Sequence, residues 1–295
     1  MKSKNIYYYL VLKLAVLITC HNRKEKTKKC LQNLFEQELP ERASMDVFLC
    51  DDGSSDGTSE MVNQEFPMVH LISGTGNLYW NGGMRLAWEK ALENGSFDFF
   101  LWLNDDTFLY KGAITSIVNS YSILEKPGII SAACCDPLTK KYTYGGHGDP
   151  SPIFPNGKLQ KLKFINGNFV LVPKEIVQKI GVLSTAYTQN LGDFDYGLRA
   201  QKAGFNCYLT EEYLGECEYN QGEDWANSQL KLGKRWKIAH SIKGLNMREF
   251  IHFKTFHEGK IVGFKSTVDT YLKLLAPKQY VQVRNFLKKK VLKSL

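Results

Sequence analysis

The stretch FDFFLWLNDD, residues 97–106, joins a run of aromatic and aliphatic side chains to two adjacent carboxylates. Such an apolar run is typical of a strand inside a parallel sheet, and carboxylates at its end are unfavourable unless a cation or a solvated cleft receives them. Ligands bind at this carboxyl edge in open α/β sheets, and Mg²⁺ commonly uses one or two carboxylates plus phosphate oxygens. Asn104-Asp105-Asp106 therefore indicates a metal site. The alternative is a polar turn in which Asp106 and Thr107 cap a helix that starts near Lys111.

Strands and helices alternate on the amino-terminal side of this stretch. Apolar strands are predicted at residues 14–19, 46–50, 69–73 and 97–103, and helices at residues 23–38, 80–93 and between the loop 51–58 and residue 65. Strands separated by helices indicate right-handed βαβ units, because parallel neighbours need a crossover connection. The predicted fold class is α/β, with a Rossmann-like, mostly parallel sheet flanked by helices.

The regularity weakens after Pro127. The pattern predicts strands at residues 128–134, 164–172 and 206–209, a long loop or small hairpin at 136–157, a helix opened by Pro173 and a helix at 194–203. From Trp225 onward the chain is basic and mainly helical. The predicted organisation is a lead-in over residues 1–13, an α/β domain over 14–224 and a basic helical extension over 225–295.

The composition is that of an ordinary folded protein, with 43% hydrophobic and 23% charged residues among 295. Seven cysteines, an odd number without a CxxC pair, indicate neither a disulfide framework nor a zinc ribbon. The apolar run 6–20 is interrupted by Lys13 and lacks a small-residue cleavage site, so it is interpreted as a lead-in and a buried first strand. We expect the catalytic region to be cytoplasmic.

Charge is unevenly distributed along the chain. From Lys231 to the end there are sixteen Lys and Arg residues and three acids, a net charge of +13, so residues 1–230 carry −5 of the total of +8. A basic, aromatic-containing extension on an acidic body favours an anionic partner, either a phospholipid surface or nucleic acid. A solvated helical face accounts for the charge equally well.

Two further acidic clusters lie where ligands would bind. The loop 51–58 follows a predicted strand, and Asp56 or Ser55 can cap the next helix, which leaves a carboxylate free for a nucleobase or ribose. Asp193 and Asp195 lie in the first turn of a predicted helix, where either the helix dipole stabilises them or one acts as a general base. All three clusters are placed to converge on one edge of the sheet.

Small residues surround these clusters. Gly82 and Gly83, in the segment from Asn77 to Met84, permit close approach of the backbone to a sugar or phosphate. Trp80 lies in the same segment and could belong to the core. Asn168 follows a glycine in a predicted strand, which is typical of a strand bulge.

Five segments in this order resemble glycosyltransferase family 2, most closely its rhamnosyltransferase-like branch. They are residues 14–22, 51–58, 76–84, 103–107 and 192–200. The resemblance covers residues 14–215 and implies a GT-A fold. It also implies an inverting transfer of a sugar from a nucleoside diphosphate sugar.

The resemblance also implies roles for individual residues. Asp52 would contact the nucleobase or ribose, with Thr19 and Asn22 beside it at the exit of the first strand. Asp106 would be the principal ligand of Mg²⁺ or Mn²⁺, with Asp105 nearby. The remaining substrate-binding candidates are Asn77, Trp80, Gly82, Gly83, Asn168 and Asp195. By the resemblance, Trp80 would stack on the nucleotide sugar unless it belongs to the core. Asn168 would lie in the segment before the acceptor side of the cleft, with a strand bulge as the alternative.

Asp193 falls where the family carries its catalytic base, and Asp195 is the second candidate. Two departures stand beside this match. Many relatives have Glu-Asp where this chain has Gly192-Asp193, and many place a metal-binding histidine downstream, where this chain reads GECEYN over residues 215–220. Glu216 or Glu218 could supply the missing oxygen ligand.

The expected function is a membrane-peripheral glycosyltransferase at the inner face of the cell membrane. It would add a sugar, from dTDP-rhamnose by resemblance alone, to a polysaccharide or lipid-linked oligosaccharide, without a nucleic-acid partner. A sugar nucleotidyltransferase is one alternative, but it would carry a Gly-rich basic phosphate loop where this chain has residues 19–23. The other is a catalytically inactive binding protein, which the retained Asp52, Asp106 and Asp193 argue against.

Overall fold

The computed structural model describes residues 11–220, 222 and 224–291. The chain divides into two compact units, one of residues 1–188 with 192–219 and one of residues 189–191 with 220–295. The predicted lead-in falls largely outside the described residues, and Leu12 and Lys13 already belong to the first strand. The second unit takes the chain from residue 220, slightly before the expected boundary at 224.

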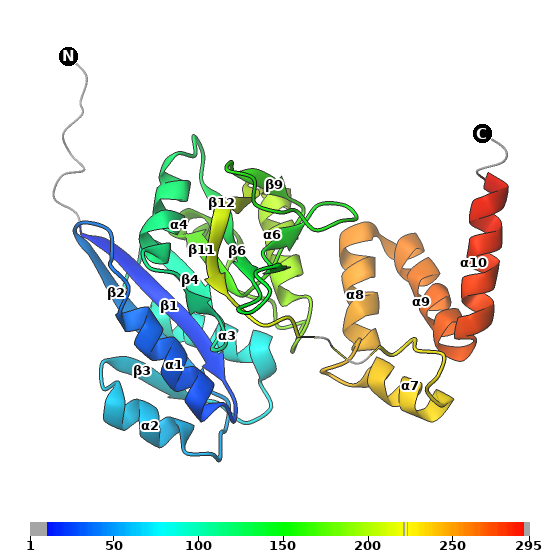
Figure 1. Cartoon of the computed structure of the whole chain (residues 1–295), viewed down its shortest axis with the longest axis horizontal. Helices are drawn as coiled ribbons and strands as arrows, with labels where there is room; N and C mark the ends of the chain where they lie inside the picture. Colours follow the sequence, from blue (N-terminus) through cyan, green and yellow to red (C-terminus); the bar gives the residue numbers. More distant parts are fainter. Residues whose placement is uncertain (1–10, 221, 223, 292–295) are drawn as a thin grey trace. The chain divides into compact units, whose positions relative to one another are not determined.

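The first half of the central sheet is parallel (Figure 1). Its strands lie in the order β3 (Val69–Ser73), β2 (Ala43–Asp51), β1 (Leu12–Cys20) and β4 (Phe99–Leu103). Residues from Leu14 to Ile18 are completely buried, because helices cover both faces of the sheet. The carboxyl ends of β2 and β4 therefore lie at one edge, two strands apart, as the sequence predicts.

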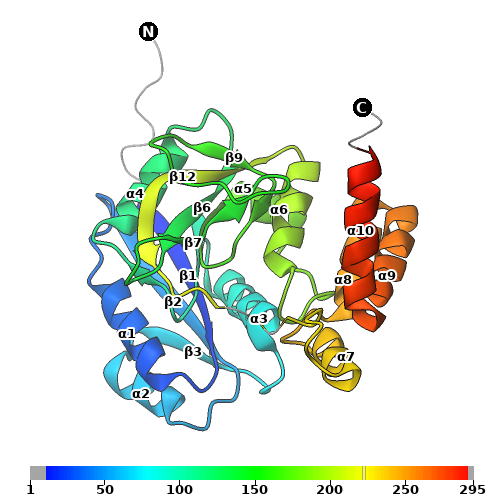
Figure 2. The ribbon, with the colours of Figure 1, turned by 45° about the vertical axis from the view of Figure 1, so that its right-hand side comes forward.

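Helices cover both faces of the sheet (Figure 2). An apolar layer holds them against the sheet on each face. One face packs against α1 (Lys24–Phe35), α2 (Thr58–Glu65) and α4 (Ala113–Ser122). The other face packs against α3 (Tyr79–Asn94), α5 (Lys174–Ile180) and α6 (Gly192–Lys202), where Trp88, Trp102 and Tyr196 form a buried aromatic cluster. This α/β/α layering agrees with the predicted fold class.

The second half of the sheet contains a reversed strand. β11 (Phe169–Pro173) runs antiparallel between β4 and β6 (Gly128–Cys135), and β6 pairs in parallel with β12 (Asn206–Glu216). Strand β12, at eleven residues, is longer than the strand predicted over residues 206–209. The short strands β7 (Tyr142–Tyr144) and β9 (Gln160–Leu162) add to β6 and β12.

The prediction of a single strand over residues 164–172 is wrong. Phe164–Ile165 (β10) pairs with Gly146–His147 (β8) in a separate two-stranded sheet, and only β11 enters the central sheet. The break falls at Asn166-Gly167-Asn168, where a Cβ on Gly167 would lie 2.5 Å from the Trp80 ring. The chain changes sheets here because the glycine lets the backbone pass close to an aromatic side chain.

The capping alternative for the acidic stretch is also wrong. Phe108–Leu109 form a strand, β5, paired with β12 directly after Thr107. Helix α4 begins later, at Ala113, with Gly112 at its N-cap and no side-chain cap. Asp106 and Thr107 are thus separated from α4 by a strand, and the two carboxylates are left at the sheet edge.

The second unit is helical, with α7 (Leu232–His240), α8 (Met247–Glu258), α9 (Lys260–Leu275) and α10 (Pro277–Val291). Its fully buried apolar cluster consists of Ala239, Met247 and Leu274. Helices α8 and α9 pack closely at Gly263, where a Cβ would lie 2.1 Å from Thr255 Oγ1. Among the described residues, no helix combines the length and apolarity needed to cross a bilayer.

Candidate functional site

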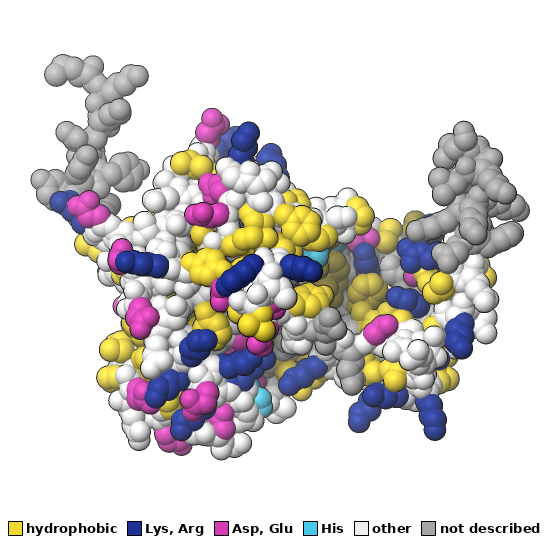
Figure 3. Space-filling view, in the orientation of Figure 1, with side chains coloured by type: hydrophobic (Ala, Val, Ile, Leu, Met, Phe, Trp, Pro, Cys, Tyr) yellow, Lys and Arg dark blue, Asp and Glu magenta, His cyan; other side chains and the backbone are white. Residues whose placement is uncertain are grey.

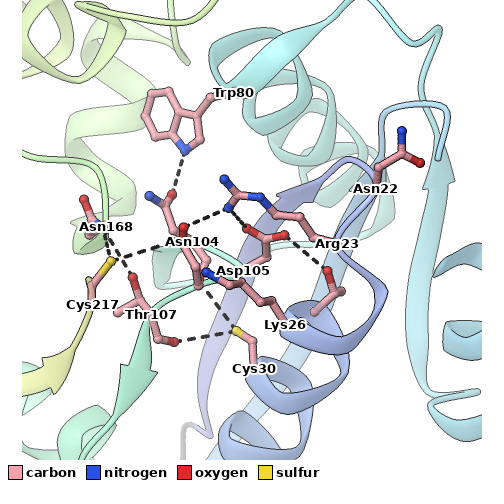
Figure 4. Close-up of polar contacts among 12 residues, drawn as sticks. Asn22, Arg23, Lys26, Cys30, Trp80, Asn104, Asp105, Thr107, Asn168 and Cys217 are labelled. Carbon is pink, nitrogen blue, oxygen red and sulfur yellow. Dashed lines mark hydrogen bonds and ion pairs between the residues drawn. The ribbon is translucent and has the colours of Figure 1, made fainter. Parts of the chain in front are cut away.

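The two carboxylates after β4 meet the guanidinium of Arg23, at the start of α1 (Figure 4). Arg23 Nη1 lies 2.9 Å from Asp105 Oδ1 and 2.8 Å from Asp106 Oδ2. Asp105 is buried and also accepts a hydrogen bond from Thr27 Oγ1 at 3.2 Å. Burial raises the pKa of Asp105 to about 6, although Arg23 opposes that shift. The Asp106 side chain is 25% exposed, so it is the carboxylate that solvent reaches.

This pair fits a hard divalent cation. Both carboxylates already direct one oxygen at the same positive group, and Arg23 is exposed enough to give up that position. Among the residues that the structure describes, no group of three His, Cys, Asp or Glu side chains is arranged to hold a metal ion. A cation held here would therefore take the two carboxylates as protein ligands and share them with substrate phosphates and water, as Mg²⁺ and Mn²⁺ commonly do.

Cys217 occupies the neighbourhood where the sequence suggested a glutamate. Its Sγ lies 3.7 Å from Asp106 Oδ1 and accepts a hydrogen bond from Asn168 Nδ2 at 3.3 Å. Glu216 instead bonds to Tyr110 and Lys140, and Glu218 pairs with Lys26 at 3.5 Å. Cys217 and Arg23 were not predicted from the sequence as residues of the site. The two-residue alternation of a strand could have indicated Cys217, because it places Glu216 and Cys217 on opposite faces.

Asp52, at the end of β2, is fully engaged by backbone groups. Its Oδ1 accepts from the Gly76 N–H at 2.7 Å, and its Oδ2 accepts from the N–H groups of Leu78 and Tyr79 at 2.8 and 2.9 Å. The side chain is buried. Asp52 therefore fixes the loop before α3 and the first turn of that helix, and its contact with a nucleobase or ribose stays a prediction.

Replacing Asp52 with Ala is expected to destabilise the protein by about 2 kcal/mol or more, because buried N–H donors lose their acceptor. The free energy of unfolding, measured by urea denaturation, checks this. Asp46→Asn is the matched control, since Asp46 lies on the same strand with an exposed side chain. Equal stabilities of the two variants would contradict the role assigned to Asp52.

The other candidates around the first strand shape the loops. Thr19 packs so closely against Gly83 of α3 that a Cβ added to this glycine would lie 2.1 Å from Thr19 Oγ1. Gly82 is buried in the same helix. Asn22 Oδ1 accepts from the Ser55 N–H at 2.8 Å, which ties the loop after β2 to the end of β1. Thr19, Gly82 and Gly83 are buried, whereas Asn22 and Asn77 are exposed.

Trp80 connects the acidic edge to the third cluster. Its Nε1–H donates to Asn104 Oδ1 at 2.7 Å (Figure 4), and its ring lies against Gly167. The Gly167 N–H donates to Asp193 Oδ2 at 3.0 Å. Asn168, one residue further, donates to Thr107 Oγ1 at 3.4 Å. The segment 166–168 therefore joins the turn after β4, which carries Asp105 and Asp106, to the helix that carries Asp193.

Asp193 and Asp195 differ in what they contact. Asp195 is buried and accepts from Arg199 Nε at 2.8 Å, and Arg199 in turn donates to the carbonyls of Ile180 and Val182. Asp193 is partly exposed and accepts only from backbone N–H groups among the bonds described for it. Although part of the residue is exposed, burial of its carboxyl group raises the pKa of Asp193 to about 6. Asp195 thus has a structural ion pair, whereas the hydrogen bonds described for Asp193 come from the backbone.

The parallel sheet, its reversed strand and its acidic edge define a GT-A type fold. The chain belongs to glycosyl transferase family 2, whose family model matches residues 15–180.

Two named relatives show what the chain is similar to. Poly-beta-1,6-N-acetyl-D-glucosamine synthase of Staphylococcus epidermidis is 22% identical over 258 residues, 78% of this chain and 58% of the synthase. The chain thus spans little more than half the length of that relative. N-acetylglucosaminyl-diphospho-decaprenol L-rhamnosyltransferase of Mycobacterium tuberculosis is 24% identical over 213 residues, 61% of this chain and 69% of the relative.

Solved structures support the fold. The mannosyltransferase PcManGT of Pyrobaculum calidifontis, in complex with GDP-Man and Mn²⁺, has a TM-score of 0.56 at 16% identity and covers 91% of this chain and 72% of its own. S. aureus TarS 1-349, in complex with UDP-GlcNAc, has a TM-score of 0.52 at 12% identity, and the match covers 81% of this chain and 67% of TarS 1-349. GalNAc-T7 with UDP, GalNAc and Mn²⁺ has a TM-score of 0.57 at 11% identity, and the match covers 86% of this chain and 55% of the GalNAc-T7 chain.

Proposed function

We propose that the chain transfers a sugar from a nucleoside diphosphate sugar to a hydroxyl group of a polysaccharide or lipid-linked oligosaccharide, with inversion at the sugar carbon. The observation that carries the proposal is the connection of the Asp105 and Asp106 pair to Asp193 through Asn104, Trp80 and Gly167. It joins a cation-binding edge to a carboxylate with a raised pKa. Family membership and the names of the relatives support the same reaction class.

Asp106, with Asp105 behind it, would hold Mg²⁺ or Mn²⁺ against the diphosphate. A divalent cation bound there stabilises the negative charge that develops on the leaving diphosphate. Arg23 keeps the two carboxylates neutralised before the donor binds, because its guanidinium lies between them. Asp52 holds the loop 74–79 in place at the neighbouring strand end.

Asp193 would act as the general base. A base works best when its pKa lies near the operating pH, and desolvation moves the pKa of Asp193 to about 6. As the acceptor oxygen forms its bond to the sugar carbon, its proton passes to the Asp193 carboxylate, and the bond from that carbon to the diphosphate oxygen breaks. The transition state resembles that of glycoside hydrolysis, with the acceptor on the face opposite the leaving group. One displacement therefore inverts the configuration.

For the donor we propose dTDP-rhamnose. The similarity to an L-rhamnosyltransferase supports it, but the similar solved structures hold GDP-Man, UDP-GlcNAc or UDP.

The test is release of free nucleoside diphosphate from dTDP-, UDP- and GDP-sugars with Mn²⁺ or Mg²⁺ and a saccharide acceptor. We expect release from one donor class, and the matching nucleoside diphosphate should raise the melting temperature only with a divalent cation present. A sugar nucleotidyltransferase would instead form pyrophosphate from a nucleoside triphosphate. Pyrophosphate formation without transfer would overturn the proposal, as would binding of a donor without its turnover under any of these conditions.

The proposal includes a peripheral contact of the second unit with an anionic membrane at the cytoplasmic side. The net charge of +13 from Lys231 onward supports it. An acceptor carried on a lipid would then be delivered close to the enzyme.

A further inference from the structure

Helix α9 carries an exposed apolar stripe. Its large hydrophobic side chains recur every three or four residues, the spacing of a single helix face. They are Ile261 (73% exposed), Phe264 (70%), Val268 (43%), Leu272 (54%) and Leu275 (53%). Single exposed hydrophobic residues are ordinary, but five of them aligned on one helix of sixteen residues form a continuous surface that calls for a partner.

The stripe is distinct from the face that α9 packs inside its own unit. Gly263, Thr270 and Leu274 are the buried residues of α9, and Gly263 lies against Thr255 of α8. Two aromatic residues of the neighbouring helices α7 and α8 are placed differently. Phe253 is buried, and Trp236 lies over His240 at a ring separation of 4.3 Å. The stripe is therefore mainly aliphatic, and composition alone does not reveal it.

Basic side chains accompany the stripe. Lys260 and Lys265 are exposed on α9 itself, and Lys278 and Arg284 are exposed on the next helix. The acid Asp269 on α9 accepts a hydrogen bond from Tyr280 at 2.6 Å. Figure 3 shows hydrophobic and basic side chains next to one another on these helices. Apolar residues flanked by lysines are typical of a helix that lies in the headgroup region of an anionic bilayer.

We propose that α9 is the membrane-binding element of this protein. Its stripe enters the boundary between headgroups and acyl chains, and Lys260, Lys265, Lys278 and Arg284 contact anionic phospholipids. This inference deepens the proposed membrane contact and rests on it for the choice of partner. The charge complementarity favours a lipid surface, and the aliphatic stripe favours lipid over nucleic acid, which offers no apolar phase to receive it.

The experiment is flotation of the whole chain with vesicles of equal parts phosphatidylglycerol and phosphatidylcholine, compared with phosphatidylcholine alone. We expect binding to the anionic vesicles that weakens at high salt. The variant with Phe264→Gln, Val268→Gln and Leu272→Gln should bind about tenfold more weakly, since three apolar insertions are lost. The matched control replaces the exposed Met68, Ile123 and Leu138 of the first unit with Gln. It should bind like the unmodified protein.

Amide exchange of residues 260–275 gives a second measurement, and we expect it to slow when anionic vesicles are added. Equal flotation of the stripe variant and the unmodified protein would overturn the role of α9 and leave a purely electrostatic contact. If the unmodified protein does not float, the membrane contact itself fails, whereas sugar transfer to a soluble acceptor tests the catalytic proposal separately. A dimer that the stripe variant dissociates, with flotation unchanged, would assign the stripe to a contact between two copies and overturn the inference.

Discussion

Replacing Asp193 with asparagine is expected to lower the rate of sugar transfer by about 10²- to 10⁴-fold, the usual contribution of a positioned general base. Asparagine keeps the size of the side chain and one acceptor for the N–H groups of Gly167 and Phe194. It cannot accept the proton of the acceptor hydroxyl. The loss should therefore appear in kcat, measured as nucleoside diphosphate release at saturating donor, with a smaller change in KM.

The pH profile separates this role from a structural one. A base must be deprotonated to act, so the raised pKa of Asp193 predicts that kcat falls as the pH drops below about 6. The folded pKa lies above the usual value of 3.8, so the ionised form is disfavoured by folding. The contribution of Asp193 to stability therefore decreases as the pH rises from about 4 to about 6. In the Asp193→Asn protein, the residual kcat should no longer show this fall below about pH 6, which we call the acid limb of the profile.

Asp195→Asn is the contrasting variant. It breaks the ion pair with Arg199, so it should lower the melting temperature and leave the acid limb of kcat in place. An Asp193→Asn protein with full activity would remove Asp193 from the role of base, and an acid limb lost only in Asp195→Asn would move that role to Asp195.

The sequence allowed the parallel half of the sheet and its acidic edge to be predicted, because both depend on local patterns. The apolar run before Asp105 is interpretable as a buried strand wherever it pairs, and its carboxylates then have to lie at the strand's end. The antiparallel β11 could not be predicted. Its insertion between β4 and β6 depends on pairing between residues far apart in the chain, which alternation of apolar residues does not encode.

The contacts of the site residues were hidden for the same reason. Asp52 has the sequence context of a free acid in a turn, but its acceptors are used by backbone N–H groups more than twenty residues away. Arg23 was placed in a predicted helix without a partner, and its two partners lie about eighty residues further along the chain. Pattern identified the residue types at the site, whereas which groups neutralise one another depends on the folded geometry.

Replacing Asp106 with asparagine is expected to abolish sugar transfer and to weaken Mn²⁺ binding by about tenfold or more, because a carboxylate ligand is lost from a site that shares the cation with phosphates. Mn²⁺ affinity can be measured without turnover by calorimetry or electron paramagnetic resonance, in the presence of the matching nucleoside diphosphate. The cation-dependent rise in melting temperature should disappear in the same variant. An Asp106→Asn protein that binds Mn²⁺ normally would contradict the role of Asp106 as a ligand.

Arg23→Gln is expected to change Mn²⁺ binding in the opposite direction from Asp106→Asn, which distinguishes loss of a ligand from general damage to the site. In the unmodified protein the Arg23 guanidinium occupies the position between Asp105 Oδ1 and Asp106 Oδ2, so a cation has to displace it. Without nucleotide, the Arg23→Gln protein should bind Mn²⁺ up to about tenfold more tightly. In the unmodified protein the cation has to break the charge-assisted hydrogen bonds of a half-exposed arginine, and in the variant this cost is absent. Weaker Mn²⁺ binding in both variants would mean that Arg23 supports the metal site instead of competing for it. Opposite changes in the two variants would instead identify one carboxylate pair that alternates between arginine and a divalent cation.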